Sequence, residues 1–317
     1  MVKRILTASN ESAAILSFTI LFVVFAVLLR TTWASNVPSM LRDISWLGIV
    51  AIGQALLMIS GEFDLSVGSV FAFVGMMFVL LVRTGIGSLP ALIGAMLIAL
   101  IIGLLNGLIT WKFKLPSLLV TLGFLFIYRG LVHFVTKGFA LTIPDTLQGN
   151  PLIRFLGGKQ LGFHNSILLF ALLTISFTII LSLTKFGNHL FAVGGDTRSA
   201  LSCGVLPGRT KIITFITCSL LAGFSGIIAA CSLSSVAPGT AENLEFETIA
   251  AAVIGGCSLR GGVGTVWGTV LGVGTLMALK AGLILIGINI FVYQILLGLL
   301  LVSLIAIKGL LPKLFTE

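Results

Sequence analysis

Two acidic side chains, Glu62 and Asp64, lie between long apolar runs in ISGEFDLSVGSVFAF, where hardly any loop is available to hold them in water. If the runs cross a bilayer, a charge at its centre costs about 2.5–3.5 kcal/mol on insertion scales, so each carboxylate must face water, pair or cap a helix. The sequence leaves two alternatives open. Asp64 or Ser66 caps the next helix in a turn at the inner membrane surface, or the acids form a polar rim on a solute path.

Two basic side chains also lie in apolar surroundings. Arg129 follows TLGFLFIY, and Lys280 is near the end of another apolar segment. We expect both to lie near an outer membrane interface, where a long side chain can extend its charge to water.

Sequence motifs of catalysis are absent. There is no GxxxxGK[ST] phosphate loop, no HExxH and no GxSxG, and the four cysteines and three histidines have no metal-ligand spacing. The sequence therefore predicts a protein that is not an enzyme, has no metal or cofactor of its own and does not itself hydrolyse ATP.

The composition indicates where these residues must be placed. Hydrophobic residues make up 57% of the 317 residues and charged residues 9%, against about 45–50% and about 25% in soluble domains. A bilayer core about 30 Å thick needs roughly 20 mostly apolar residues per helix. The sequence predicts an all-α integral membrane protein, a polytopic bundle of about ten transmembrane helices in a single domain, residues 1–317. The nine clear spans are Ala13–Arg30, Ser45–Ser60, Leu65–Val82, Pro90–Trp111, Pro116–Thr136, Ser166–Thr184, Ile212–Ser232, Val266–Ala281 and Ile290–Lys308.

The tenth segment, Glu247–Cys257, is too short to cross alone. It is either a crossing continued by polar flanks or a half-helix that dips in and returns. The first segment follows Lys3 and Arg4 as a signal peptide would, but its length and the apolar segment after it favour a first span over a cleaved leader. Ten crossings place both termini on one side.

Lysine and arginine in short loops favour the cytoplasm. With a cytoplasmic N-terminus, Lys112, Lys114 and the basic cluster of 185–211 fall on the cytoplasmic side, and the net charge of +9 is largely explained by this topology. Nucleic-acid binding is therefore not expected.

Two loops are long enough to carry structure. The outer loop, 137–165, is rich in glycine and proline, and we expect it to fold over the outer mouth. In the inner loop, 185–211, Asp196 can cap a short helix Thr197–Cys203 that Gly204 ends, lying parallel to the membrane. On the residues alone, a docking role for this helix and a plain loop turn are equally open.

Glycines at four-residue spacing predict close helix packing rather than chemistry. They occur as Gly103 and Gly107, and as Gly264, Gly268 and Gly272. The stretch IGGCSLRGGVGTVWG interrupts the apolar pattern as ISGEFDLSVGSV does, which hints at two broken-helix elements on the same side of the membrane.

Four ordered blocks resemble the membrane permease of ribose-type ABC importers: SGEFDLSVGSV, NGLITWKFKLPSLLVTLGFLFIYRGL, AVGGDTRSALSCGV and FETIAAAVIGGCSLRGGVGTVWGTVLG. The resemblance spans roughly residues 45–310. It implies ten spans, pairing with a second permease subunit as a homodimer or heterodimer, and a central path between the two subunits. It also implies a cytoplasmic ABC ATPase that binds the ATP, and a solute-binding protein outside.

The resemblance also assigns candidate site residues. The solute path would include Asp64, Ser66, Asn106, Thr121 and Arg129, with Glu62 standing where glycine is commoner in the family. The short helix would be the coupling helix that docks on the ATPase, with its contact residues among Gly195, Asp196, Arg198, Ala200, Leu201 and Gly204. Its end, DTRSALSCG, departs from the family's usual second acid and Ser-Gly ending.

We therefore expect a bacterial inner-membrane permease, in contact with lipid and with both termini cytoplasmic, that imports a monosaccharide or a sugar-like solute. Two alternatives remain open on the sequence. A secondary transporter would use Glu62, Asp64, Arg129 and Lys280 as an ion relay, and a membrane scaffold would leave the acids as caps. The sequence does not indicate which sugar is carried.

Overall fold

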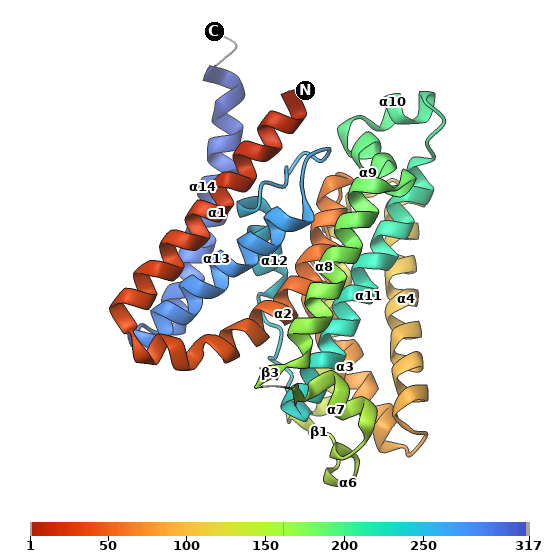
Figure 1. Cartoon of the computed structure of the whole chain (residues 1–317). Coiled ribbons are helices and arrows are strands. Elements are labelled where there is room, and N and C mark those ends of the chain that lie inside the picture. Colours follow the sequence, from red (N-terminus) through yellow and green to blue (C-terminus); the bar gives the residue numbers. More distant parts are fainter. Residues whose placement is uncertain (1, 161, 315–317) are drawn as a thin grey trace.

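The chain folds into a bundle of long helices (Figure 1), and we describe it from a computed structural model. The structure describes residues 2–160 and 162–314, with side chains for 12–147, 149–160 and 162–303. Within these residues, seven helices are long and apolar enough to cross a membrane, and two more are shorter apolar helices. The all-α polytopic fold is therefore confirmed. The nine helices are α1 (Val2–Leu29), α2 (Thr31–Ile59), α3 (Val67–Arg83), α4 (Ser88–Lys112), α5 (Ser117–Thr136), α8 (Asn165–Leu183), α11 (Pro207–Leu233), α13 (Val266–Leu285) and α14 (Ile290–Leu314).

Helices α1, α2 and α11 begin several residues earlier than the apolar pattern predicts, with α1 starting at Val2 rather than Ala13. The second span was expected from Ser45, but α2 begins at Thr31, one residue after α1, and contains Pro38. Its first turns run across one end of the bundle before the helix turns inward (Figure 1), so hydropathy alone did not count them as a span. Helix α11 begins at Pro207 rather than Ile212, because proline is favoured in the first helical turn, where its missing N–H is not needed.

The tenth crossing is made by a short helix with non-helical flanks. Helix α12 (Leu244–Ile254) is 11 residues long. Before it, β4 (Ser235–Val236) pairs antiparallel with β1 (Leu141–Thr142) at one end of the bundle. After it, the turn 255–265 reaches the opposite end, where Gly262 N–H donates to the carbonyl of Ile59 at 2.8 Å. The segment therefore crosses with polar flanks and does not return to the side from which it came.

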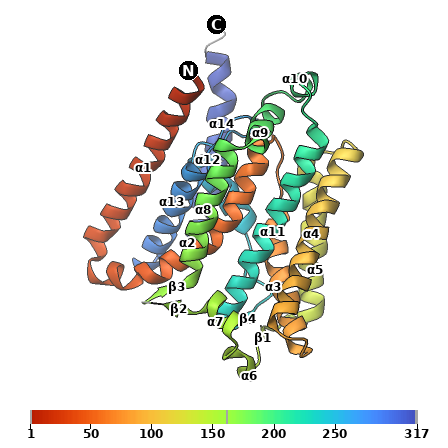
Figure 2. The same cartoon turned by 45° about the vertical axis from the view of Figure 1, so that its right-hand side comes forward.

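The two predicted loops lie at opposite ends of the bundle. The loop 137–165 holds β1, α6 (Asp145–Gln148), α7 (Pro151–Gly157), β2 (Lys159–Gln160) and β3 (Phe163–His164), and α7 packs against α8 and α11. The other loop holds α10 (Thr197–Ser202), preceded by a helix that the sequence analysis missed, α9 (Lys185–Gly195). The start of α1 and the end of α14 lie at the same end as α10 (Figures 1 and 2).

Burial differs sharply among the helices. In the most apolar stretch of α2, 83% of the residues are buried, whereas the share is 11% in the corresponding stretch of α1 and 22% in that of α8. Helix α2 is thus the centre of the subunit, and α1 and α8 lie at its periphery. Glycine allows the closest helix contacts, as at Gly226 of α11, which lies against the backbone carbonyl of Phe71 on α3.

Candidate functional site

Four of the predicted path residues form one buried polar cluster at the break between α2 and α3. The Asp64 carboxylate accepts hydrogen bonds from the Ser66 N–H, at 2.7 Å, and from the Ser66 hydroxyl. The Asn106 amide of α4 donates to Asp64 at 3.2 Å and to Ser66 Oγ at 3.0 Å. Thr121 Oγ1 of α5 accepts from the Leu65 N–H at 3.0 Å. The sequence blocks that hold these residues therefore meet in space.

This cluster holds the chain reversal and contacts no open path. Asp64, Ser66, Asn106 and Thr121 are each 0% exposed. Ser66 occupies the N-cap position of α3, but its side chain makes no capping bond and donates to Asp64 instead. The expected side-chain cap is therefore wrong in its detail, because the Asp64 carboxylate takes up the Ser66 N–H and hydroxyl together.

Glu62 has a cationic partner. Its carboxylate forms an ion pair with Lys211 on the first turns of α11, and both side chains are 14% exposed. Lys211 Nζ also lies 6.0 Å from the ring centroid of Trp111. The positive charge of Lys211 thus balances the negative charge of Glu62, which lies between two apolar runs of the sequence.

Arg129 and Lys280 each have an acidic partner that the sequence analysis did not predict, and their place near an outer membrane interface stays a prediction. Arg129 of α5 pairs with Glu245 at 3.1 Å, and Lys280 of α13 pairs with Glu247 at 2.8 Å. These pairs form because α12 starts inside the bundle, which brings the two acids of its first turn to the depth of these cations. Acids are favoured there because the N-terminal end of a helix carries partial positive charge.

Glu245 and Glu247 are the residues that sequence reasoning missed. Both are buried, with Glu245 2% and Glu247 7% exposed. A signal was present, since two acids beginning a short apolar segment require cations in a low-dielectric interior. What the sequence lacks is the relative depth of α5, α12 and α13.

A charged cavity lies next to the Lys280–Glu247 pair. It has a volume of about 320 Å³, and its lining includes Trp46, Glu242 and the Arg42–Asp43 ion pair. The Arg42 guanidinium carbon lies 4.8 Å from the Trp46 ring centroid. With Arg129–Glu245, these residues form a charged layer in the half of the bundle away from α10.

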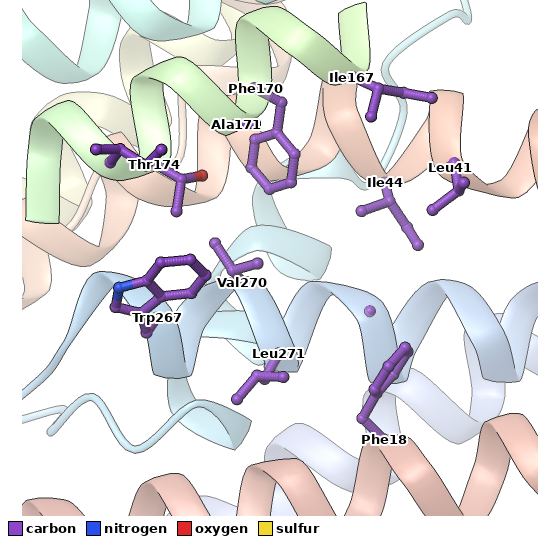
Figure 3. Close-up of a pocket in the computed structure, with 12 residues that line it drawn as sticks. Phe18, Leu41, Ile44, Ile167, Phe170, Ala171, Thr174, Trp267, Val270 and Leu271 are labelled. Atoms are coloured by element: carbon purple, nitrogen blue, oxygen red, sulfur yellow. The ribbon is translucent and has the colours of Figure 1, made fainter. Parts of the chain in front are cut away.

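A second cavity, of about 300 Å³, lies between α1, α2, α8 and α13 (Figure 3). Phe18, Phe170 and Trp267 are among its lining side chains, and Thr174 supplies a hydroxyl. This lining suits hydrocarbon and not a polar solute, so we do not place the solute site there.

The predicted short helix is confirmed at the end of the bundle where α1 begins (Figure 1). Asp196 caps α10 by accepting the Ser199 N–H at 2.6 Å, and this hydrogen bond lowers the pKa of Asp196 below its ordinary value. Gly204 follows the helix with φ +80°. Ala200 is buried, whereas Leu201 is 59% exposed, so α10 presents an apolar side chain outward.

The other predicted coupling residues lie around this helix. Gly195 ends α9 directly before the cap, and Arg198 is exposed on the first turn of α10. Five of the six predicted coupling residues are thus exposed on one surface element, and Ala200 is buried beneath it. The six predicted path residues divide into the buried cluster, Glu62 and Arg129.

Comparison with known proteins decides the family. Residues 36–305 match the family described as the permease component of the branched-chain amino acid transport system. The chain belongs to this permease family.

The similar proteins are permeases of ABC importers. The chain is 36% identical over 294 residues to a probable ABC transporter permease of Escherichia coli K12, covering 92% of this permease and 87% of that protein. It is 30% identical over 260 residues to the ribose import permease of the same strain, covering 82% of this permease and 81% of that protein. It is 28% identical over 309 residues to an autoinducer 2 import permease of Photorhabdus luminescens, covering 96% of this permease and 92% of that protein. No solved structure matches.

These matches confirm the resemblance to ribose-type ABC permeases. They support the ABC alternative and not the ion-coupled transporter. The permease is a multi-pass membrane protein, and its family is the transport component of importers rather than an enzyme family. The family description names amino acids, whereas two of these relatives are named for ribose and for autoinducer 2, so membership establishes the transport role and not the solute.

Proposed function

We propose that this permease is the membrane conduit of an ABC importer for a monosaccharide or a sugar-like solute, and that a separate ATPase drives it. The observation that carries the proposal is the match over residues 36–305. The relatives named for ribose, xylose or arabinose, and autoinducer 2 support the solute class.

A second permease subunit would cover the uncovered face of α5. Leu119, Phe126 and Phe134 are 62%, 66% and 81% exposed, and nothing lies within 4 Å of a Cβ built at Gly123 or Gly130. An apolar face of this extent with glycine gaps suits a neighbouring helix or a path wall as well as lipid. We place the central path along this face of α5.

Arg129 is the path candidate that the geometry favours. Its side chain is 29% exposed, whereas the Asp64 cluster is fully buried. Glu245 would orient the Arg129 guanidinium, which could then donate to the hydroxyls of a sugar. A binding protein would deliver the solute to the end of the bundle formed by the loop 137–165.

The orientation follows from α10. If α10 docks on the ATPase, its end of the bundle is cytoplasmic, and so are both termini. We therefore propose a bacterial inner-membrane location with both termini inside. Lys3, Arg4, Lys308 and Lys313, which would be cytoplasmic in this orientation, have side chains outside the described set.

Co-purification tests the partnership. The tagged permease is co-expressed with its genomic-neighbour ATPase, and the ATPase should be recovered with it. Leu201→Asp places a charge on the outward apolar side chain of α10 and should release the ATPase. Leu115→Asp is the matched control, because Leu115 is 48% exposed on the α4–α5 turn at the same end. Recovery of the ATPase with Leu201→Asp at the wild-type level would contradict docking through α10.

A further inference from the structure

A polar pocket lies beside α10, and its walls come from segments far apart in the sequence. Its volume is about 350 Å³. The walls are the end of α2, the α9–α10 junction, the first turns of α11 and the turn between α12 and α13. The lining residues are Ser60, Gly61, Val193, Gly194, Gly195, Asp196, Thr197, Arg198, Lys211 and Arg260.

The floor of this pocket is a backbone contact between three glycine-containing segments. A Cβ at Gly261 would lie 2.9 Å from the Cα of Gly61 and 2.6 Å from the carbonyl oxygen of Gly194. Close beside it, Gly262 N–H donates to the carbonyl of Ile59. Only residues without a side chain allow the α9–α10 junction and the α12–α13 turn to meet over the end of α2. The two interrupted stretches that the sequence analysis compared therefore do meet on the same side of the membrane.

Two of the cations that line the pocket remain available. Lys211 is paired with Glu62, and the Asp196 carboxylate accepts the Ser199 N–H. Arg198 and Arg260 are exposed, and neither belongs to an ion pair within 4 Å among the described side chains, although the charge of Arg198 also favours the charged form of Asp196. The pocket thus offers two guanidinium groups, which bind carboxylates in a bidentate geometry.

We propose that this pocket receives an aspartate or glutamate side chain of the ATPase, with Arg198 and Arg260 as its ligands. The inference rests on the proposed function, because it needs an ATPase on this face. A protein side chain fits the position better than a lipid headgroup does. The pocket covers the end of α2, the most buried of the candidate spans among the described residues, and not the periphery formed by α1 and α8.

The second ligand gives the contact a mechanical consequence. Arg198 is on the coupling helix, but Arg260 is on the turn that continues directly from α12 into α13. A carboxylate held by both would join the ATPase to α12 as well as to α10. Helix α12 carries Glu245 and Glu247, so movement of the ATPase would reach the charged layer in the other half of the membrane through one short helix.

Binding of the ATPase to the purified full-length permease in lipid nanodiscs tests the proposal. Arg260→Glu should weaken binding by about tenfold or more and reduce its salt dependence, because it places like charges together. Arg260→Gln should give a smaller loss. Arg209→Glu is the matched control, since Arg209 is exposed on the first turn of α11 but does not line the pocket. The affinity of this variant for the ATPase should stay within about twofold of the wild-type value. The thermal midpoint of each variant checks folding.

The outcomes separate this proposal from the proposed function. If Arg260→Glu binds like wild type while Leu201→Asp releases the ATPase, the pocket proposal is wrong and docking through α10 stands. If neither variant changes binding, docking through α10 fails as well. A loss that occurs only in nanodiscs with anionic lipid would assign the pocket to a headgroup and overturn the proposal. Restored binding by an ATPase with one acid changed to arginine would identify the carboxylate and support it.

Discussion

The candidate site residues of this permease form hydrogen bonds and ion pairs mostly with other residues of the bundle. Asp64, Ser66, Asn106 and Thr121 hold the reversal between α2 and α3, and four further acids are paired with cations. Burying a polar group without partners is costly, and the cost is greater in a protein surrounded by hydrocarbon. At the scale of single residues, we therefore expect changes within these groups to act first on folding and only then on transport.

Asp64→Ala should lower the free energy of unfolding by about 1–3 kcal/mol, because it leaves the Ser66 N–H and the Asn106 amide buried without an acceptor. Asp64→Asn should cost less, since its amide oxygen can still accept from Ser66. Thermal unfolding of the purified permease measures both. A wild-type thermal midpoint for Asp64→Ala together with lost transport would show that Asp64 acts on the solute instead.

Arg129→Met should destabilise the protein by about 1–3 kcal/mol, because Glu245, 2% exposed, then stays buried without its cation. The double variant with Glu245→Gln should recover part of that loss, since no unpaired charge remains. A double-mutant cycle of thermal stability measures the coupling between the two side chains. Strictly additive effects would show that the ion pair is not what holds α5 to α12.

At the scale of elements, short and interrupted helices form the parts that set this bundle apart. Helix α10 is only six residues long and depends on its cap, and α12 depends on its ion pairs and on close contact with α13. Long spans such as α4 are held by continuous apolar packing. We therefore expect the short helices to respond to single changes that the long spans tolerate.

The cap of α10 should be stable across the neutral pH range. The Ser199 N–H favours the charged form of Asp196 and lowers its pKa, so this contribution is complete above the ordinary aspartate pKa of about 3.9 and is lost as pH falls through the lowered value. Hydrogen exchange of the peptide 197–203 should be equally protected between about pH 5 and 8, after correction for intrinsic rates. Asp196→Ala should lose protection throughout, whereas Asp196→Asn should keep most of it. Protection that falls between pH 8 and 5 would contradict this role of Asp196.

Gly226→Ala should destabilise the contact between α3 and α11, because the added Cβ would meet the backbone of Phe71, which cannot move away as a side chain can. Gly123→Ala is the matched control on α5, where nothing lies within 4 Å, and it should raise stability slightly through helix propensity. Thermal midpoints compare the two variants. Equal midpoints would show that α3 and α11 are less tightly packed than the structure indicates.

The sequence predicts well what depends on local pattern. Hydropathy located the seven long spans and the two shorter apolar helices, and capping chemistry located α10 between its cap at Asp196 and Gly204. It missed α9, whose residues are too polar to read as a span, and it did not predict acidic partners for Arg129 and Lys280. The partners of these two cations could not be predicted, because pairing across 116 and 33 residues depends on how deep α12 lies.

At the scale of the whole molecule, the two ends of the bundle carry different structural features. One end carries α10 and the pocket formed by the glycine contact, and the other carries the loop 137–165 and the charged layer. Helix α12 and its flanks connect the ends, from β4, which pairs with β1 of that loop, to the turn that touches the α9–α10 junction. This arrangement fits a conduit whose energy comes from a partner at one end and whose solute arrives at the other.

Uptake of labelled monosaccharides into proteoliposomes tests this account most directly. The vesicles contain this permease, its ATPase and its binding protein, and they are supplied with ribose, xylose, arabinose and galactose in turn. We predict uptake of at least one sugar that requires ATP on the ATPase side, stops with a non-hydrolysable analogue and persists when ion gradients are collapsed. Uptake that continues without nucleotide but stops when an ion gradient is collapsed would contradict the account.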